Sequence, residues 1–344
     1  MNKHALHWIR LSACAFIGSA VLSLSGCGNS FLSPKSQTPI QRTDFLLNTF
    51  VDIKIYDTTD TTILDDVMAL CKDLEAQFSR TIEGSEIYRL NHRRKDEQVF
   101  ELSERAAELL SLSFEYCELS GGAFDITIEP VSSLWDFTSG EAVLPEADLI
   151  KEAVSKVGFE NLLLENQTLT IQSPNTTIDL GAIAKGYIAD EMKEYLIEQG
   201  VKSAVINLGG NVLCIGSKPD GEPFKIGLKK PFAQESETFA IADITDMSVV
   251  TSGVYERYFE LDGKHYHHIL NPQTGYPYEN DLLSVTILSD SSADGDGLST
   301  TCFSLGLEKG MELVNSLDGV YGCFIDEDYN IYYSEGMEAF LNET

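Results

Sequence analysis

The alternation of apolar and polar residues along the chain predicts strands and helices in irregular order. Residues 50–56 alternate apolar and polar side chains, as in a strand with one solvated face. Residues 63–78 repeat apolar side chains at the spacing of an amphipathic helix. Ser103 is expected to cap a second helix that ends at Gly121-Gly122, and a third helix is expected between Pro145 and Gly158.

The later part of the chain continues this mixture. Helices are predicted at 183–199, 297–305 and 308–317. Strands are predicted at 162–164, 169–171, 177–180, 203–207, 212–216, 224–228, 239–244, 254–261, 265–270 and 283–288, with a hairpin over 320–333. Because no regular strand–helix repeat is present, we predict the α+β class, with a mostly antiparallel sheet and packed helices.

Residues 1–26 are predicted to be a bacterial lipoprotein signal peptide. Lys3 and Arg10 flank the start of an apolar run, which at about 14 residues is too short for a mature membrane helix. Leu24-Ser25-Gly26-Cys27 resembles a lipobox, which predicts cleavage before Cys27 and lipidation of its sulfur; a chance cysteine after an ordinary signal peptide is the alternative. Residues 27–43 are expected to be a flexible tether and 44–344 a single domain. We therefore expect a protein anchored by lipid to a bacterial cell membrane, on its extracytoplasmic side.

Charge and cysteine content narrow the possible functions. The chain has 24 Lys and Arg against 54 Asp and Glu, a formal net charge of -30, which excludes most nucleic-acid partners. The basic cluster at 93–95 is followed at once by acids and is interpreted as a solvated turn. Beyond Cys27 five cysteines remain, an odd number without a C-x-x-C pair, so buried thiols are expected rather than disulfides or a zinc site.

Four loop segments hold more Gly, Asp and small polar residues than a core requires: 121–127, 178–186, 207–211 and 265–277. Backbone N–H groups where the second segment turns into a helix could hold a phosphate, with Lys185 adding charge. The first three segments also have simpler interpretations, which are, in order, a helix cap, an ordinary strand-to-helix turn and a hairpin turn. The histidines of the fourth alternate along a strand, which favours one histidine facing a site over a three-histidine metal cage.

Asp296 and Thr300 form the most specific chemical pattern. They are four residues apart, so a helix that begins near Asp296 places both side-chain oxygens on one face. A carboxylate and a hydroxyl there suit Mg²⁺, which binds few protein oxygens and completes its shell with water and substrate phosphates. The alternative is that Asp296 only caps the helix.

Taken in order, these segments resemble the ApbE family, the FAD:protein FMN transferases. The motifs are Gly122-Ala123-Phe124-Asp125, Asp179-Leu180-Gly181 with Ile183-Ala184-Lys185-Gly186, Asn207-Leu208-Gly209-Gly210-Asn211, His268-Ile269 with Asn271-Pro272 and Thr274-Gly275, and Asp296 with Leu298-Ser299-Thr300 and Leu305-Gly306. They are spread over nearly all of the chain beyond the tether. Two departures exist: Leu47-Asn48-Thr49 stands where the family usually has Met-Gly-Thr, and Asn271 stands where Asp is commoner.

The resemblance implies the family's T-fold-like domain and its cofactor sites. An FAD site would be built from Leu47, Ala123, Phe124, Asp125, Asp179, Lys185 and Ile269. Mg²⁺ would be held by the backbone carbonyl of Ala182 and the side chains of Asp296 and Thr300. The implied reaction moves FMN from FAD to a Ser or Thr hydroxyl of a target protein through a phosphoester bond and releases AMP. The expected acceptor is a membrane-associated redox flavoprotein subunit.

Two residues are expected to be catalytic. His268, with an unperturbed pKa near 6.5, is a candidate general base or phosphate hydrogen-bond donor. Asp296 would act through the cation, which offsets negative charge as the hydroxyl attacks. Two other functions stay open on the same residues: a Mg²⁺-dependent FAD pyrophosphatase that uses water and yields FMN and AMP, and a noncatalytic FAD-binding lipoprotein.

Overall fold

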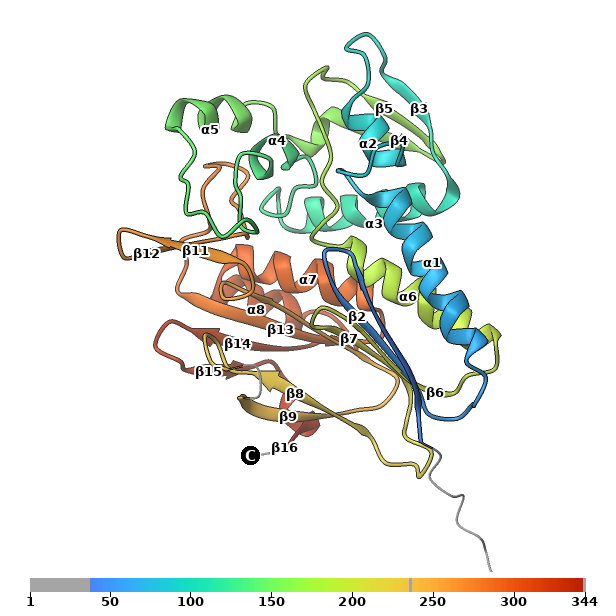
Figure 1. The fold of residues 1–344 in the computed structure, drawn as a ribbon. Helices are drawn as coiled ribbons and strands as arrows, with labels where there is room; N and C mark the ends of the chain where they lie inside the picture. Colours follow the sequence, from blue (N-terminus) through green and yellow to red (C-terminus); the bar gives the residue numbers. More distant parts are fainter. Residues whose placement is uncertain (1–37, 235–236, 343–344) are drawn as a thin grey trace, which may run out of the picture. The chain divides into compact units, whose positions relative to one another are not determined.

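An eight-stranded, fully antiparallel sheet organises the chain in the computed structural model, which describes residues 38–234 and 237–342 (Figure 1). Its strands are, in spatial order, β1 (Ile40–Leu46), β2 (Thr49–Ile55), β6 (Ser203–Leu208), β7 (Asn211–Gly216), β10 (Ser248–Gly253), β13 (Leu282–Ser289), β14 (Tyr321–Asp326) and β15 (Ile331–Tyr333). Three neighbouring pairs, β1–β2, β6–β7 and β14–β15, are hairpins, and the other four pairs join strands that are distant in sequence.

Each face of this sheet is covered by a different layer. Alternate residues of β2 and β6, such as Val51, Ile53 and Ile206, are fully buried in the main core with the helices. The helices of this core are α1 (Thr62–Phe78), α3 (Glu104–Leu119), α6 (Ala184–Glu198), α7 (Ser292–Leu305) and α8 (Leu307–Asn315). The opposite face buries Cys214 and Leu288 against a three-stranded sheet. Its strands are β8 (Phe224–Lys229), β9 (Thr238–Ile244) and β16 (Leu341–Asn342).

Smaller elements surround this framework. They are α2 (Glu86–Asn91), the sheet β3 (Val99–Glu101), β5 (Thr168–Ile171) and β4 (Leu162–Glu165), α4 (Glu129–Ser132), α5 (Ala147–Val154), the hairpin β11 (Tyr258–Leu261) and β12 (Lys264–His267), and 3₁₀ turns at Phe159–Asn161 and Met337–Phe340. Trp135 joins two of these parts, because its ring stacks on Phe259 of β11 and its indole Nε1 donates to the carbonyl of Gly275 at 3.0 Å.

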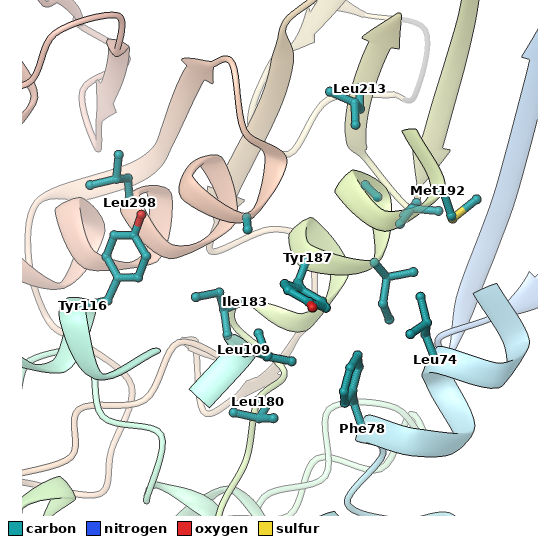
Figure 2. Close-up of a cluster of buried hydrophobic side chains, with 14 of the residues drawn as sticks. Leu74, Phe78, Leu109, Tyr116, Leu180, Ile183, Tyr187, Met192, Leu213 and Leu298 are labelled. Atoms are coloured by element: carbon teal, nitrogen blue, oxygen red, sulfur yellow. The ribbon is translucent and has the colours of Figure 1, made fainter. Parts of the chain in front are cut away.

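Helices α6 and α7 lie in direct backbone contact, and this contact positions the candidate site. A methyl group added at Gly186 would meet the carbonyl oxygen of Ser292 at 2.2 Å, so only glycine permits the approach. The carboxylate of Asp190 accepts from the backbone N–H of Ser292 and Ala293, both at 2.9 Å, and so caps the start of α7. Figure 2 shows Ile183, just before α6, and Tyr187 of α6 packed beside Leu109 of α3 and Phe78 of α1, which fixes the other side of α6 in the main core.

The α+β, mostly antiparallel prediction is confirmed, as are the predicted buried thiols. Cys71, Cys117, Cys214, Cys302 and Cys323 are free and buried, and burial raises the pKa of each thiol. No helix among residues 38–234 and 237–342 is long and apolar enough to cross a membrane. The predicted signal peptide and the lipidation of Cys27 lie outside the described residues.

Four predicted boundaries are wrong. Residues 177–180 form no strand: the backbone N–H and C=O of Ile178 bond instead to the side-chain amide of Asn91, at 2.7 and 2.8 Å. The single strand expected at 254–261 is β11 alone, and β10 lies before it. Helix α7 begins at Ser292 with Ser291 as its cap, so Asp296 lies inside the helix and is no cap. Strand β1 begins at Ile40, within the span expected to be tether.

Candidate active site

A buried carboxylate at the contact between α6 and α7 is the centre of the site. Asp296 is 4% exposed, and its Oδ2 accepts from the backbone N–H of Gly186 at 3.0 Å. The Lys185 ammonium lies 3.2 Å from Oδ1 of the same carboxylate. The charge of Asp296 is therefore balanced by one cation and one N–H group, as a buried carboxylate requires.

Hydroxyl groups adjoin this carboxylate. Thr300 follows Asp296 by one turn of α7, and its Oγ1 lies 3.1 Å from Oγ of Ser252 in β10. The expected i, i+4 placement of Asp296 and Thr300 on one helix is thus present, although the helix starts earlier than expected. Ala182 lies in the turn just before α6, next to Lys185 in sequence. Among the described residues no group of three or more His, Cys, Asp or Glu side chains is arranged to hold a metal.

His268 is the histidine of the cluster whose pKa is affected by the charge of Lys185. The Nδ1 of His268 lies 3.3 Å from the backbone carbonyl oxygen of Arg257, so Nδ1 carries the hydrogen and Nε2 is left as an acceptor. Burial lowers the pKa of His268 to about 3, with smaller contributions from the positive charges of Arg257 and Lys185. His268 is therefore a neutral imidazole at physiological pH, and Lys185 is close enough to affect it.

The other two histidines have structural or surface roles. His267 is buried, and its ring is held between the carbonyl of Tyr278 at 3.0 Å and the N–H of Ile269 at 3.3 Å. Burial lowers its pKa to about 4. His265 is exposed on β12, 3.6 Å from Glu260. Of the three histidines, His268 therefore remains the candidate for the site.

The turn between β1 and β2 contacts the same region. Leu47 and Asn48 both have φ of 55°, the left-handed conformation of a two-residue hairpin turn, which asparagine tolerates well. The N–H of Leu47 donates to Glu75 at 2.8 Å, and the Arg257 guanidinium lies 3.5 Å from the Asn48 carbonyl oxygen. Asn48, which stands where the family resemblance leads us to expect glycine, thus adopts the left-handed conformation of this turn.

The loop after α3 approaches the histidine segment through one tyrosine. The hydroxyl of Tyr278 donates to the carbonyl of Ala123 at 2.8 Å, and the N–H of Tyr278 donates to the carbonyl of Ile269 at 3.0 Å. Phe124 is buried edge-on to Tyr116. Tyr278 was missed by sequence reasoning, because only the fold brings residues 123 and 278 together.

Asp125 and Asp179 are engaged within the protein rather than with Asp296. Asp125 accepts from Thr127 N–H at 2.7 Å and from Phe159 N–H at 3.1 Å, and burial raises its pKa. Asp179 pairs with the Arg80 guanidinium at 3.0 Å and accepts from Ser132 at 2.7 Å. The two loops are joined where the N–H of Asp179 donates to the carbonyl of Ile126 at 2.7 Å. Arg80 follows α1 without any motif and could not have been found from sequence.

The structure thus pairs Lys185 with Asp296 and carries Thr300 one turn further along the same helix, and the charge of Lys185 contributes to the lowered pKa of His268. It also joins Ala123 to Ile269 through Tyr278, and Leu47 to Arg257 through the hairpin turn. A hollow of about 670 Å³ between α2 and β3 contains none of these residues.

A lysine, a buried carboxylate with an adjoining hydroxyl, and a neutral histidine are typical of enzymes that act on anionic phosphate groups with the help of a hard cation. Comparison with known proteins identifies the family of the chain. The ApbE family model matches residues 47–325, so the chain belongs to the ApbE family.

Known relatives match over most of their length. A protein of Klebsiella pneumoniae (strain 342) named FAD:protein FMN transferase is 36% identical over 291 residues, covering 84% of this chain and 90% of the relative. One of the same name from Treponema pallidum (strain Nichols) is 30% identical and covers 95% of both chains. Among solved structures, the flavin transferase ApbE from Vibrio cholerae is 28% identical with a TM-score of 0.79, covering 88% of this chain and 100% of that chain.

Proposed function

We propose that this chain, an FAD:protein FMN transferase by its family and by the names of its relatives, moves FMN from FAD to a Ser or Thr hydroxyl of an acceptor protein with the help of Mg²⁺. In this reaction the hydroxyl oxygen attacks the FMN-side phosphorus. The bond from that phosphorus to the oxygen of the AMP phosphate breaks, and AMP leaves with the electron pair. The single observation that carries the proposal is the buried Asp296 with Lys185 and Thr300 beside it.

The donor atoms around Asp296 fit a hard divalent cation. The available groups are all oxygen donors: the Asp296 carboxylate, the Thr300 hydroxyl and the backbone carbonyl of Ala182. The Lys185 ammonium lies 3.2 Å from Asp296, so a positive charge is accommodated beside this carboxylate, and a bound dication would displace the ammonium. A bound Mg²⁺ would supply Lewis acidity toward the diphosphate and offset the charge that develops on it.

Lys185 is placed to meet the diphosphate. Its ammonium is half-buried and lies at the start of α6, beside Asp296. In a chain of formal net charge -30, a dinucleotide is repelled at long range, so a local cation is required to hold it. We assign Lys185 to the phosphates of FAD.

His268 is placed to accept the proton of the attacking hydroxyl. Its Nδ1–H is bonded to the Arg257 carbonyl, so the free Nε2 is the basic atom. The low pKa, caused first by burial and then by Arg257, makes it a weak base in the unliganded protein. An anionic diphosphate beside the ring would raise this pKa again, so His268 would be a stronger base when substrate is bound.

The remaining residues expected at the FAD site act mainly through the backbone. The carboxylates of Asp125 and Asp179 accept N–H groups of their own loops, so we assign them to holding loop shape at the flavin side. Leu47, Ala123, Phe124 and Ile269 would supply the apolar and backbone contacts to FAD.

We also propose that Cys27 is lipidated and holds the protein at the extracytoplasmic face of a bacterial cell membrane, where the acceptor is a membrane-associated redox subunit. The lipobox at 24–27 supports this assignment. Replacement Cys27→Ser should release the protein from the membrane fraction, whereas an unchanged distribution would contradict the anchor.

The test is mass spectrometry of a candidate acceptor domain after incubation with this protein, FAD and Mg²⁺. One added FMN on a Ser or Thr, together with AMP, is the expected result. FMN and AMP released equally fast without acceptor would instead indicate the pyrophosphatase. FAD binding without turnover, unaffected by Asp296→Ala, would indicate a noncatalytic FAD-binding protein.

A further inference from the structure

Three hydroxyl groups form a continuous row between β10 and α7. The Oγ of Ser252 lies 2.9 Å from Oγ of Ser299 and 3.1 Å from Oγ1 of Thr300. The Oγ of Ser299 lies 3.1 Å from the backbone carbonyl oxygen of Asp296. Ser252 is therefore the only one of the three that contacts both others.

The direction of every hydrogen bond in this row follows from counting hydrogens. Each hydroxyl has one hydrogen to donate, and a carbonyl oxygen can only accept. Ser299 must therefore donate to Asp296, which leaves Ser252 to donate to Ser299. Because the hydrogen of Ser252 is then used, the contact with Thr300 can form only if Thr300 donates.

We propose that Ser252 is a positioning residue that takes the hydrogen of the Thr300 hydroxyl and so turns the lone pairs of Oγ1 toward the cation site. A cation is bound by oxygen lone pairs and is repelled by a hydroxyl hydrogen that faces it. Without Ser252 the Thr300 hydroxyl rotates freely, and in a fraction of the molecules its hydrogen points toward the cation site. This inference rests on the proposed Mg²⁺ site at Asp296 and Thr300.

The surroundings of Ser252 hold its side chain in a fixed position. Ser252 is paired with Val285 of β13 in the central sheet, and Ser299 is fully buried. Helix α7 lies close against β10, since a methyl group added at Gly295 would meet Cγ2 of Val250 at 2.7 Å. The three hydroxyls are thus held at fixed separations before any cation binds.

The neighbouring residue supplies a matched control. Thr251 points to the opposite face of β10, where its hydroxyl bonds to that of Thr286 at 2.8 Å. Replacement Thr251→Val removes a hydroxyl bond of the same kind from the same strand but leaves the row at Thr300 intact.

The experiment is calorimetric titration of Mg²⁺ into the FAD-loaded protein. Ser252→Ala should weaken Mg²⁺ binding about tenfold, the usual effect of losing a residue that orients a metal ligand. Thr251→Val should bind Mg²⁺ as the wild type does, and FAD binding without Mg²⁺ should be the same in all three proteins. Ser252→Thr, which keeps the hydroxyl, should restore Mg²⁺ binding.

A second variant covers the case in which Ser252→Ala is poorly folded. Ser252→Cys nearly keeps the volume but offers only a weak acceptor, so it should also lose Mg²⁺ affinity. Mg²⁺ binding of wild-type strength in a folded Ser252→Ala or Ser252→Cys protein would overturn the role of Ser252 while leaving the proposed function intact. A wild-type protein that binds no Mg²⁺ would instead remove the proposed metal and this inference together.

Discussion

Replacing Gly186 with alanine tests whether the contact between α6 and α7 holds the site together. The added methyl would lie 2.2 Å from the carbonyl oxygen and 2.6 Å from the carbonyl carbon of Ser292. Both are backbone atoms at the capped start of α7, so no side-chain rotation can relieve the overlap. One of the two helices must move.

Two opposing effects determine the free energy of unfolding of Gly186→Ala. Alanine favours the helix over glycine by about 1 kcal/mol. Overpacking a rigid contact costs about 1–3 kcal/mol. Separation of the helices also weakens the 3.0 Å bond from Gly186 N–H to the Asp296 carboxylate, and a hydrogen bond to a charged group contributes about 1.5–3 kcal/mol. The steric and hydrogen-bond losses outweigh the helix propensity, so we expect a net loss of about 1.5–5 kcal/mol in stability when the bond is lost.

Urea unfolding of the wild type and of two variants measures this loss. Glu194→Ala, at an exposed position of the same helix, adds alanine without a clash and should change the free energy of unfolding by less than about 0.5 kcal/mol. Gly186→Ala should also lose Mg²⁺ binding, since Asp296 moves with α7. A Gly186→Ala protein as stable as the wild type would refute the argument.

Four further predictions concern the chemistry. His268→Asn should bind FAD nearly as well as the wild type but transfer FMN about 100-fold more slowly, as expected for loss of a general base, and full activity would exclude that role. Because the pKa of His268 is lowered to about 3 and the protonated ring is inactive, kcat/KM should stay level as pH falls from 7 to 5; a decline centred near 6.5 would contradict this. Asp296→Ala should abolish Mg²⁺-dependent transfer, measured as FMN added to the acceptor, whereas retained turnover would dismiss the metal site. Tyr278→Phe removes the 2.8 Å bond to the Ala123 carbonyl and should raise the Kd of FAD about fivefold in a fluorescence titration. An unchanged Kd would show that the loop at Ala123 does not contribute to FAD binding.

Local patterns were enough to predict most of the fold. The alternation in β2 and the capping serine of α3 are signals carried by a few neighbouring residues, and both elements were found nearly to the residue. Strand β10 was missed because SVVTSG is short, partly small and polar, and does not alternate. Helix α7 was predicted to begin only near Asp296, and its glycines are needed because β10 and Tyr116 come within contact distance of that helix.

The site depended more strongly on tertiary contacts. Asp296 and Thr300 could be placed together from their spacing alone, because one helix carries both. The false strand at 177–180 shows the limit of such reasoning, since its backbone is paired by Asn91, a side chain 87 residues away from Ile178. Arg80, Ser252 and Arg257 were missed for the same reason: each reaches the site only through packing of distant segments.

The ion pair between Lys185 and Asp296 has a thermodynamic consequence. In the unliganded protein each charge neutralises the other at 3.2 Å, so a dication on Asp296 must compete with the ammonium, and a phosphate on Lys185 must compete with the carboxylate. Mg²⁺ bound to Asp296 would free the Lys185 ammonium for the FAD phosphates, and a phosphate bound to Lys185 would free the Asp296 carboxylate for Mg²⁺. If the site holds Mg²⁺ and FAD as proposed, their binding is cooperative, and the factor by which one raises the affinity of the other is the same in both directions. An internal salt bridge of this kind lowers the affinity of the site for Mg²⁺ alone and for FAD alone.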